Sequence, residues 1–459
     1  MIGNARCPAL SSRLRGNRQA CVKSKGEILL RIQSGKARNL VATAMGNMLE
    51  FYDFTVYAAF STFLSAACFP AGNPRLALLL STVIFGIGFL ARPLGAIVMG
   101  AYADHHGRRR ALTQTIWLMA LGSLMIGLLP GYATIGLAAP IMLSVARLIQ
   151  GFSAGGEMGS ATAFLVEASA RERIGLAASW QIATQHLGTI ISGLCGILLG
   201  LSMSSTQIAG WGWRLPFILG AIIVPVGAWI RRNLDETLAP DQVRQGMIKN
   251  VRHVFMRMPG RIALCMLLVA GATISQYFFL YGTIFAIHDL RFPAAFAISV
   301  NIALGLTGCP FALLGGYLSD RYDPYIVTLA ARAMLCGLFL PAFVFLLSHP
   351  SPLVFTVVLM LLMSLHALAS GACMRILPDL FPMNVRTLGT GLSYSLGVTI
   401  FGGTAQTIFT LLIDRTGNRL SWIYFVTGML VVSSSSLVFL RRIARHDRQR
   451  NRAGDAAGA

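Results

Sequence analysis

The sequence "GAYADHHGRRR" occupies residues 100–110, and a related sequence, "GYLSDRYDP", occupies residues 316–324. In both, an aspartate follows a glycine by four positions, and the two aspartates, Asp104 and Asp320, lie 216 residues apart. Each sequence follows an apolar stretch long enough for a membrane-crossing helix, which needs about 20 residues. A repeat with this period predicts a membrane protein built from two similar halves.

The composition supports a membrane protein. Of the 459 residues, 55% are hydrophobic and 12% are charged, whereas a soluble domain carries about 25% charged residues. The net charge is +21, but the basic residues gather in tails and short connections, which argues against nucleic acid as a partner. The eight cysteines form no C-x-x-C motif and no Cys/His cluster. We therefore predict no disulfide framework, no metal site and no cofactor.

Twelve apolar windows are predicted to cross the bilayer as helices. They lie at roughly 39–68, 78–101, 111–130, 137–163, 176–200, 211–231, 260–287, 293–318, 324–347, 352–377, 388–413 and 421–440. The predicted fold class is an all-α membrane protein with twelve transmembrane helices in two parallel six-helix repeats. The predicted domains are a basic tail (1–38), a six-helix half (39–231), a central loop (232–259), a second six-helix half (260–440) and a second basic tail (441–459).

The basic residues predict the orientation. Thirty of the 38 Lys and Arg lie in the two tails, in the even-numbered connections or at their edges, and five lie in the odd-numbered connections. Basic residues favour the cytoplasmic side, so both termini are expected in the cytoplasm. The first 39 residues hold nine Lys and Arg and no apolar leader. We expect a cytoplasmic tail there, although an organellar transit peptide has a similar composition.

Two acids interrupt the first window, in "GNMLEFYDFTVY" (46–57). An ionised acid at the bilayer centre costs about 2.5–3.5 kcal/mol on insertion scales. At about 100° per residue, Glu50, Asp53 and Tyr57 share one narrow polar face of a helix, and the remaining surface is apolar. The acids are therefore expected to face protein or a watery cavity, and intramembrane ionisable groups usually mark a substrate or proton path.

The fourth and fifth windows carry similar polar faces. Arg147, Gln150 and Glu157 share a face of the fourth, and Gln181 and Gln185 share a face of the fifth. The alternative is that the acids and Arg147 only neutralise one another, but buried ion pairs add little net stability, which favours a functional role for Glu50, Asp53 and Arg147. The other charged residues within the spans are Arg92, Glu157 and Arg332. For these three, a functional role and a structural role are equally open.

Motifs along nearly the whole chain resemble one family. The loop signature G-x-L-x-D-[RK]-x-G-[RK]-[RK] of the major facilitator superfamily is matched by Gly100, Asp104, Gly107, Arg108 and Arg109, and in part by Gly316, Asp320 and Arg321. The strings "GNMLEFYDF", "GFLARPLGAIVMG", "GFSAGGEMG", "WGWRLPF" and "LPDLFPMNVR" resemble the metabolite:proton symporters of that superfamily. The stretches "GLSYSLGVTIFGG" and "WGWRLPFILGAIIVP" are most similar to citrate and tricarballylate carriers.

The resemblance implies a proton-driven symporter of the bacterial inner membrane, working by alternating access and functional as a monomer. Its partners would be a small organic anion, protons and the lipid bilayer. Low-dielectric surroundings favour a neutral carboxyl group, so Glu50 or Asp53 is the predicted proton acceptor. Arg147 is predicted to bind a substrate carboxylate. The predicted neutral substrate contacts are Tyr57, Gln150, Gln181, Gln185, Asn301 and Tyr394.

The sequence leaves two alternative functions open. A betaine or proline symporter would place the positive centre of its substrate against Glu50, Asp53 and the ring of Tyr57. A non-transporting sensor is a further alternative, because fold does not fix function. An enzyme is not expected, since the spans hold no nucleophile–base set.

The loop signature is predicted to act as a conformational latch. Asp104 would lie against the N-terminus of the eleventh span, near Arg386, where a carboxylate is favoured by about 0.3–1 kcal/mol. Arg108 or Arg386 can add a charge-assisted hydrogen bond. The alternative is an ordinary solvated turn that keeps the loop inside. The predicted latch residues are Gly100, Asp104, Gly107, Arg108, Arg109, Gly316, Asp320, Arg321 and Arg386.

Overall fold

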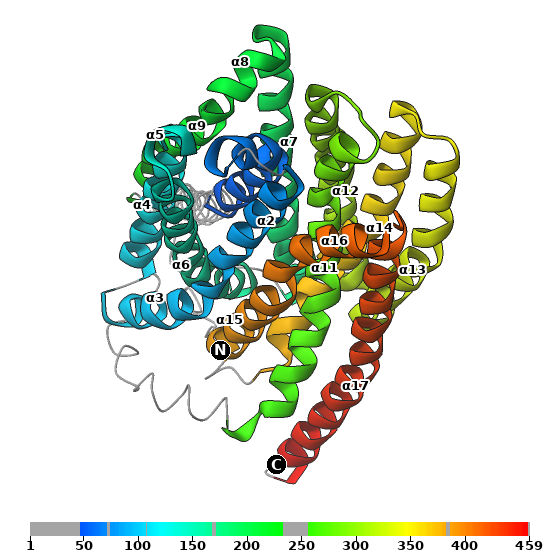
Figure 1. Cartoon of the computed structure of the whole chain (residues 1–459). Helices are drawn as coiled ribbons and strands as arrows, with labels where there is room; N and C mark the ends of the chain where they lie inside the picture. The colour runs from blue at the N-terminus through cyan, green and yellow to red at the C-terminus, as the bar shows by residue number, and fades with distance from the viewer. Residues whose placement is uncertain are drawn as a thin grey trace, which may run out of the picture.

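The computed structural model is built from helices (Figure 1). It describes residues 46–70, 74–106, 108–167, 171–232, 256–381 and 386–457, and no strand occurs in those ranges. Every predicted window contains helix, and eight helical segments of the described chain are long and apolar enough to cross a membrane. The predicted all-α membrane fold is confirmed.

The first six windows form what we call the N-terminal group. Its helices are 46–68, α2 (Pro74–Leu90), α3 (Arg92–His106), α4 (Arg108–Gly127), α6 (Ala138–Glu167), α7 (Ile174–Ser202) and α9 (Leu215–Arg232). Short segments connect them: α5 (Tyr132–Ile135), η1 (Arg171–Arg173), α8 (Ser205–Gly210) and η2 (Gly212–Arg214).

The last six windows form the C-terminal group. Its helices are α11 (Pro259–His288), α12 (Ala294–Arg321), α13 (Pro324–Ser348), α14 (Pro352–Asp379), α15 (Arg386–Gly397), η5 (Val398–Gly402), α16 (Gly403–Thr416) and α17 (Ser421–Ala457). The two groups lie side by side and meet where α7 lies next to α12 (Figure 1). Between these two helices, a side chain at Gly193 or Gly196 would collide with α12, so small residues permit the close approach.

The second predicted span is broken beside a proline. Helix α2 ends at Leu90 and α3 begins at Arg92, followed by Pro93. Proline has no N–H, so the carbonyl of Phe89, four residues earlier, loses its helical donor. The Thr399 hydroxyl of the other group donates to that carbonyl at 2.9 Å. The predicted second span is present as one crossing, interrupted at Ala91, and the freed carbonyl accepts a hydrogen bond from the other group.

The eleventh predicted span is also irregular. Helix α15 ends at Gly397, the π-helical segment η5 follows, and α16 begins at Gly403. Segment η5 contains Thr399 and packs against α2 and α11. Non-helical backbone is tolerated at membrane depth only where protein or water satisfies it. The two irregular spans therefore meet at the interface of the two groups, and both border the pocket described next.

Candidate functional site

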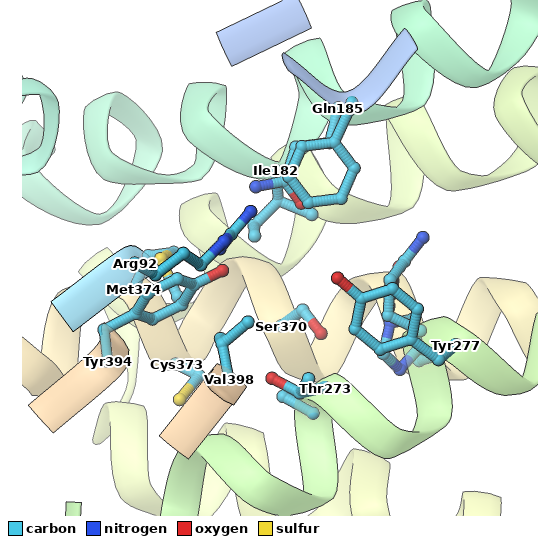
Figure 2. Close-up of a pocket in the computed structure, with 14 residues that line it drawn as sticks. Arg92, Ile182, Gln185, Thr273, Tyr277, Ser370, Cys373, Met374, Tyr394 and Val398 are labelled. Carbon is cyan, nitrogen blue, oxygen red and sulfur yellow. Dashed lines mark hydrogen bonds between the residues drawn. The ribbon is translucent and has the colours of Figure 1, made fainter. Parts of the chain in front are cut away.

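A pocket lies between the two groups of helices. It contains about 520 Å³ of empty space, open solvent at its mouth included. In Figure 2 the hydroxyls of Tyr277 and Tyr394 point toward the space between them. The residues that line it are Phe51, Arg92, Ile182, Gln185, Ala272, Thr273, Gln276, Tyr277, His366, Ser370, Cys373, Met374, Tyr394 and Val398.

Arg92 is the one cation among these lining residues, and none of them is acidic. Its Nη2 donates to Oε1 of Glu50 at 2.5 Å, and both side chains are at most 5% exposed. The guanidinium also lies over the rings of Phe54 and Phe89, 4.8 Å from each centroid. Such cation–π contacts gain strength when water is excluded. The guanidinium is thus shared between a buried acid, two aromatic rings and the pocket.

Within the described part of the chain, Asp53 is bonded only to a neutral group. Its Oδ2 accepts from the Ser123 hydroxyl at 2.7 Å, and its Oδ1 has no hydrogen-bond partner among the described residues. Ser123 in turn accepts from Nε2 of Gln150 at 2.9 Å, and Oε1 of Gln150 accepts from Arg147 at 2.7 Å. A continuous chain of hydrogen bonds therefore joins Asp53 to a guanidinium without direct ion pairing.

Arg147 lies outside the pocket lining. It is fully buried and lies over the rings of Phe54, Tyr57 and Phe85, at 5.1, 4.6 and 4.9 Å from their centroids. Within the described parts of the chain it forms no ion pair. It forms a second layer behind Arg92, because both guanidinium groups contact the ring of Phe54.

The other predicted contacts fall in two places. Gln185 and Tyr394 line the pocket. Gln181 accepts from Asn47 through its backbone carbonyl at 2.5 Å, and Asn301 is buried where α12 passes Gly193 of α7. Tyr57 donates to the carbonyl of Ser81 at 3.1 Å. The structure thus brings two of the predicted neutral contacts to the pocket and places the others in helix contacts around it.

The remaining charged span residues are all buried. Glu157 is 4% exposed on α6. Arg332 on α13 donates to the Ser433 hydroxyl at 2.5 Å and to the carbonyl of Leu268 at 3.1 Å. Those contacts join α13 to α17 and α11, so the position of Arg332 is that of a residue that holds three helices together.

Several pocket residues were not predicted from the sequence. Thr273, Gln276 and Tyr277 lie three and four positions apart on α11, and His366, Ser370 and Cys373 lie four and three apart on α14. Those spacings place each trio on one face of a helix. A helical wheel of α11 and of α14 therefore groups these neutral polar side chains, as it does for the polar face of the first window.

The second copy of the loop signature makes a contact between the two groups. The carboxylate of Asp320, at the end of α12, accepts from the backbone N–H groups of Gly175 and Leu176 at 2.7 and 2.8 Å. Both residues lie in the first turn of α7, which begins at Ile174, and a helix carries a partial positive charge at this end. Arg375 of α14 also donates to Asp320, at 2.6 Å. Asp320 therefore caps a helix of the opposite group.

Most side chains of the first copy of the loop signature, at residues 100–110, lie outside the described part of the chain. Gly107, the surroundings of Gly100, and the side chains of Asp104, Arg108, Arg109 and Arg386 lie outside the described residues. In the second copy, Gly316 lies against Gly175 and Ser179, and the Arg321 guanidinium lies over the ring of Tyr317 at 4.6 Å. The contact predicted for Asp104 at the eleventh span stays a prediction, and Asp320 makes a contact of the same kind at the fifth.

Comparison with known proteins finds relatives that match most of the chain. It is 33% identical over 407 residues to a citrate-proton symporter of Klebsiella pneumoniae, covering 88% of this chain and 91% of the relative. It is 33% identical over 412 residues to the alpha-ketoglutarate permease of Escherichia coli K12 (88% and 93%). It is 32% identical over 411 residues to a putative proline/betaine transporter of Staphylococcus haemolyticus (86% and 85%).

A solved structure has the same fold. The xylose transporter XylE from E. coli, in a partially occluded inward-open conformation, superposes with a TM-score of 0.70 at 15% identity. The match covers 89% of this chain and 98% of that one. The sequence pattern of the Major Facilitator Superfamily matches residues 43–398. With this match, the relatives above and a helical fold that has its pocket between two groups of helices, the chain belongs to the Major Facilitator Superfamily and is a multi-pass membrane transporter.

Proposed function

We propose that this transporter is a proton-coupled symporter that imports a small di- or tricarboxylate such as citrate or tricarballylate. The observation that carries the proposal is Arg92, whose guanidinium lines a pocket that has no acidic lining residue. A guanidinium presents a planar fork of donors that matches a carboxylate. The relatives named citrate-proton symporter and alpha-ketoglutarate permease support the same substrate class.

An osmolyte symporter is the second candidate. The rings of Phe51, Tyr277 and Tyr394 line the pocket, and aromatic faces attract quaternary ammonium groups. The relative named as a putative proline/betaine transporter supports this alternative. We place it second because the charge that borders the pocket is positive.

Glu50 is the better of the two predicted proton acceptors. A coupling group must change its protonation when substrate binds. Glu50 is ionised while it is paired with Arg92, and a substrate carboxylate competes for that guanidinium. Once deprived of its cation, the buried carboxylate is stabilised by taking up a proton. Asp53 has no such exchange of partners, since its bonded neighbour is the neutral Ser123 hydroxyl.

The two groups are proposed to rock about the pocket, with 39–231 and 260–440 as the moving halves. The tails 1–38 and 441–459 and the loop 232–259 are proposed to lie in the cytoplasm of a bacterial cell, with a monomer in the inner membrane as the functional unit. Asp320 is proposed to hold the cytoplasmic side shut, because its bonds to Gly175 and Leu176 cross from one group to the other. Asp104 is proposed to do the same at α15.

The substrate class can be tested by uptake of labelled citrate into proteoliposomes with an acidic exterior. We expect saturable uptake that unlabelled citrate and α-ketoglutarate inhibit, while glycine betaine and proline do not. The double variant Glu50→Gln/Arg92→Gln removes both charges of the pair and should abolish citrate uptake without leaving an unpaired buried charge. Uptake of betaine but not citrate by the unaltered protein would overturn the proposed substrate.

The coupling group can be tested with Glu50→Gln and Asp53→Asn. Glu50→Gln mimics the protonated acid permanently, so we expect loss of accumulation driven by a pH gradient while citrate exchange at equal concentrations on both sides persists. Asp53→Asn keeps an acceptor for Ser123 and should retain gradient-driven uptake. The reverse result, with Asp53→Asn uncoupled and Glu50→Gln coupled, would assign the proton to Asp53. If both variants stay coupled, neither acid is the acceptor.

The pocket can be located with Cys373, which lines it. We expect alkylation with a small maleimide to inactivate uptake, and saturating citrate to slow that inactivation. The protectable component should disappear in Cys373→Ser and persist in Cys309→Ser, which removes a half-buried thiol of α12 outside the pocket lining. Equal rates of inactivation with and without citrate would place the substrate elsewhere.

The latch can be tested with Asp320→Asn and its neighbour Asp323→Asn. Asp323 bonds to Arg441 of its own group at 2.8 Å, so it is a control for loss of a loop charge. A hydrogen bond to a charged group contributes about 1.5–3 kcal/mol, so Asp320→Asn should increase the population that is open to the cytoplasm. Ser179 lies against Gly316, so the Ser179→Cys variant reports access to this contact. Its maleimide labelling should become faster when it is combined with Asp320→Asn, and should not change when it is combined with Asp323→Asn.

We expect Asp104→Asn to act in the same direction as Asp320→Asn. If labelling at position 179 is unchanged by Asp320→Asn, or is equally raised by Asp323→Asn, Asp320 does not act as a latch.

A further inference from the structure

The wall of the pocket formed by α11 and α14 carries a pair of polar side chains. Gln276 of α11 and His366 of α14 both line the pocket, and Nε2 of His366 lies 3.1 Å from Oε1 of Gln276. The amide oxygen can only accept, so the hydrogen is on Nε2 of the ring. The His366 ring is 3% exposed and packs beside Phe279 at 5.4 Å between centroids. His366 thus fixes the direction in which the Gln276 amide points.

This bond leaves the amide nitrogen of Gln276 available. Its two N–H groups have no acceptor among the described residues, and the side chain borders the pocket rather than the closed core. The hydroxyl-bearing residues Thr273 and Ser370 line the same wall. Arg92 belongs to the opposite group, on α3. The pocket therefore presents hydrogen-bond donors from both groups of helices.

We propose that Gln276 binds a second carboxylate of the substrate, with His366 as the residue that positions its amide. This inference rests on the proposed function, in which Arg92 binds the first carboxylate. The pocket then selects anions with carboxylates at two ends. A betaine has one carboxylate, and its methylated cation has no acceptor, so it would leave the Gln276 donors unpaired. Sites built around hydrogen bonds strongly reject ligands that lack the matching group.

Such a substrate also links the two groups of helices. One carboxylate contacts Arg92 of the N-terminal group, and the other contacts Gln276 of the C-terminal group. Both contacts exist together only when the groups have closed around the pocket, so a two-ended anion stabilises that state and a one-ended ligand does not. The same residues would set both the specificity and the closure of the carrier.

The test compares two-ended and one-ended ligands in proteoliposomes. Inhibition constants for succinate and propionate are measured against labelled citrate, together with KM and kcat, for the unaltered protein and for Gln276→Glu, Gln276→Leu, His366→Phe and His366→Gln. In both Gln276 variants and in His366→Phe, we expect the inhibition constant of succinate and the KM for citrate to rise about tenfold or more. This is the effect of losing one hydrogen bond to a charged group. Propionate inhibition should change little.

His366→Gln supplies an N–H in place of Nε2–H and should restore much of the succinate preference. The control for a buried glutamine is Gln406→Leu: Gln406 lies on α16, fully buried and outside the pocket lining. Gln406→Leu should leave the ratio of the succinate and propionate inhibition constants unchanged. This ratio does not depend on how much protein reaches the membrane.

The outcomes separate the two proposals. If the unaltered protein takes up neither citrate nor α-ketoglutarate, the proposed function is wrong. If it takes up citrate, but the succinate-to-propionate ratio is the same in both Gln276 variants as in the unaltered protein, Gln276 does not bind the second carboxylate. If the ratio changes in the Gln276 variants but not in His366→Phe, His366 is not the positioning residue.

Discussion

The buried ion pair between Glu50 and Arg92 is the constraint around which the centre of this protein is organised. An ionised group at bilayer depth is costly unless it is paired and hydrogen-bonded. Glu50 comes from the first span and Arg92 from the second, and their 2.5 Å contact fixes how those two helices are rotated about their axes. The rings of Phe54 and Phe89 cover the guanidinium. The apolar side chains of the first helix are buried as well, Leu49, Val56 and Phe60 among them, so this helix is enclosed by protein on its polar and its apolar faces.

The same region explains why the spans that border the pocket are irregular. The second span is interrupted between Leu90 and Arg92, and the Phe89 carbonyl that Pro93 leaves free accepts a hydrogen bond from Thr399 of the π-helical segment η5. An unbroken α-helix satisfies its own backbone and offers nothing to a neighbour. A broken one must find donors elsewhere. The break therefore does two things: it places Arg92 at the pocket, and it ties α2 to the opposite group of helices.

The fold could be predicted from hydropathy, charge placement and the repeat of Gly and Asp, because lipid imposes helices of a known length. The site could be predicted only in part. A helical wheel groups residues on a face, but it does not say which neighbour that face meets. Arg92 and Arg147 both lie in apolar spans, yet only Arg92 reaches the pocket. Gln276 and His366 are neutral, and the sequence does not show which of the many neutral polar side chains in the spans face the pocket.

The balance of buried charge gives a physical reason for the proposed proton coupling. Among the described residues, the buried arginines are Arg92, Arg147 and Arg332, and the buried acids are Glu50, Asp53 and Glu157. With all six ionised, their formal charges cancel. An anion that enters the protein between the two groups adds negative charge to this buried set, which is costly where the dielectric constant is low. A proton on Glu50 removes one negative charge, so anion binding and protonation stabilise each other. A zwitterion brings no net charge and would need no such compensation, so proton coupling follows more directly from an anionic substrate than from an osmolyte.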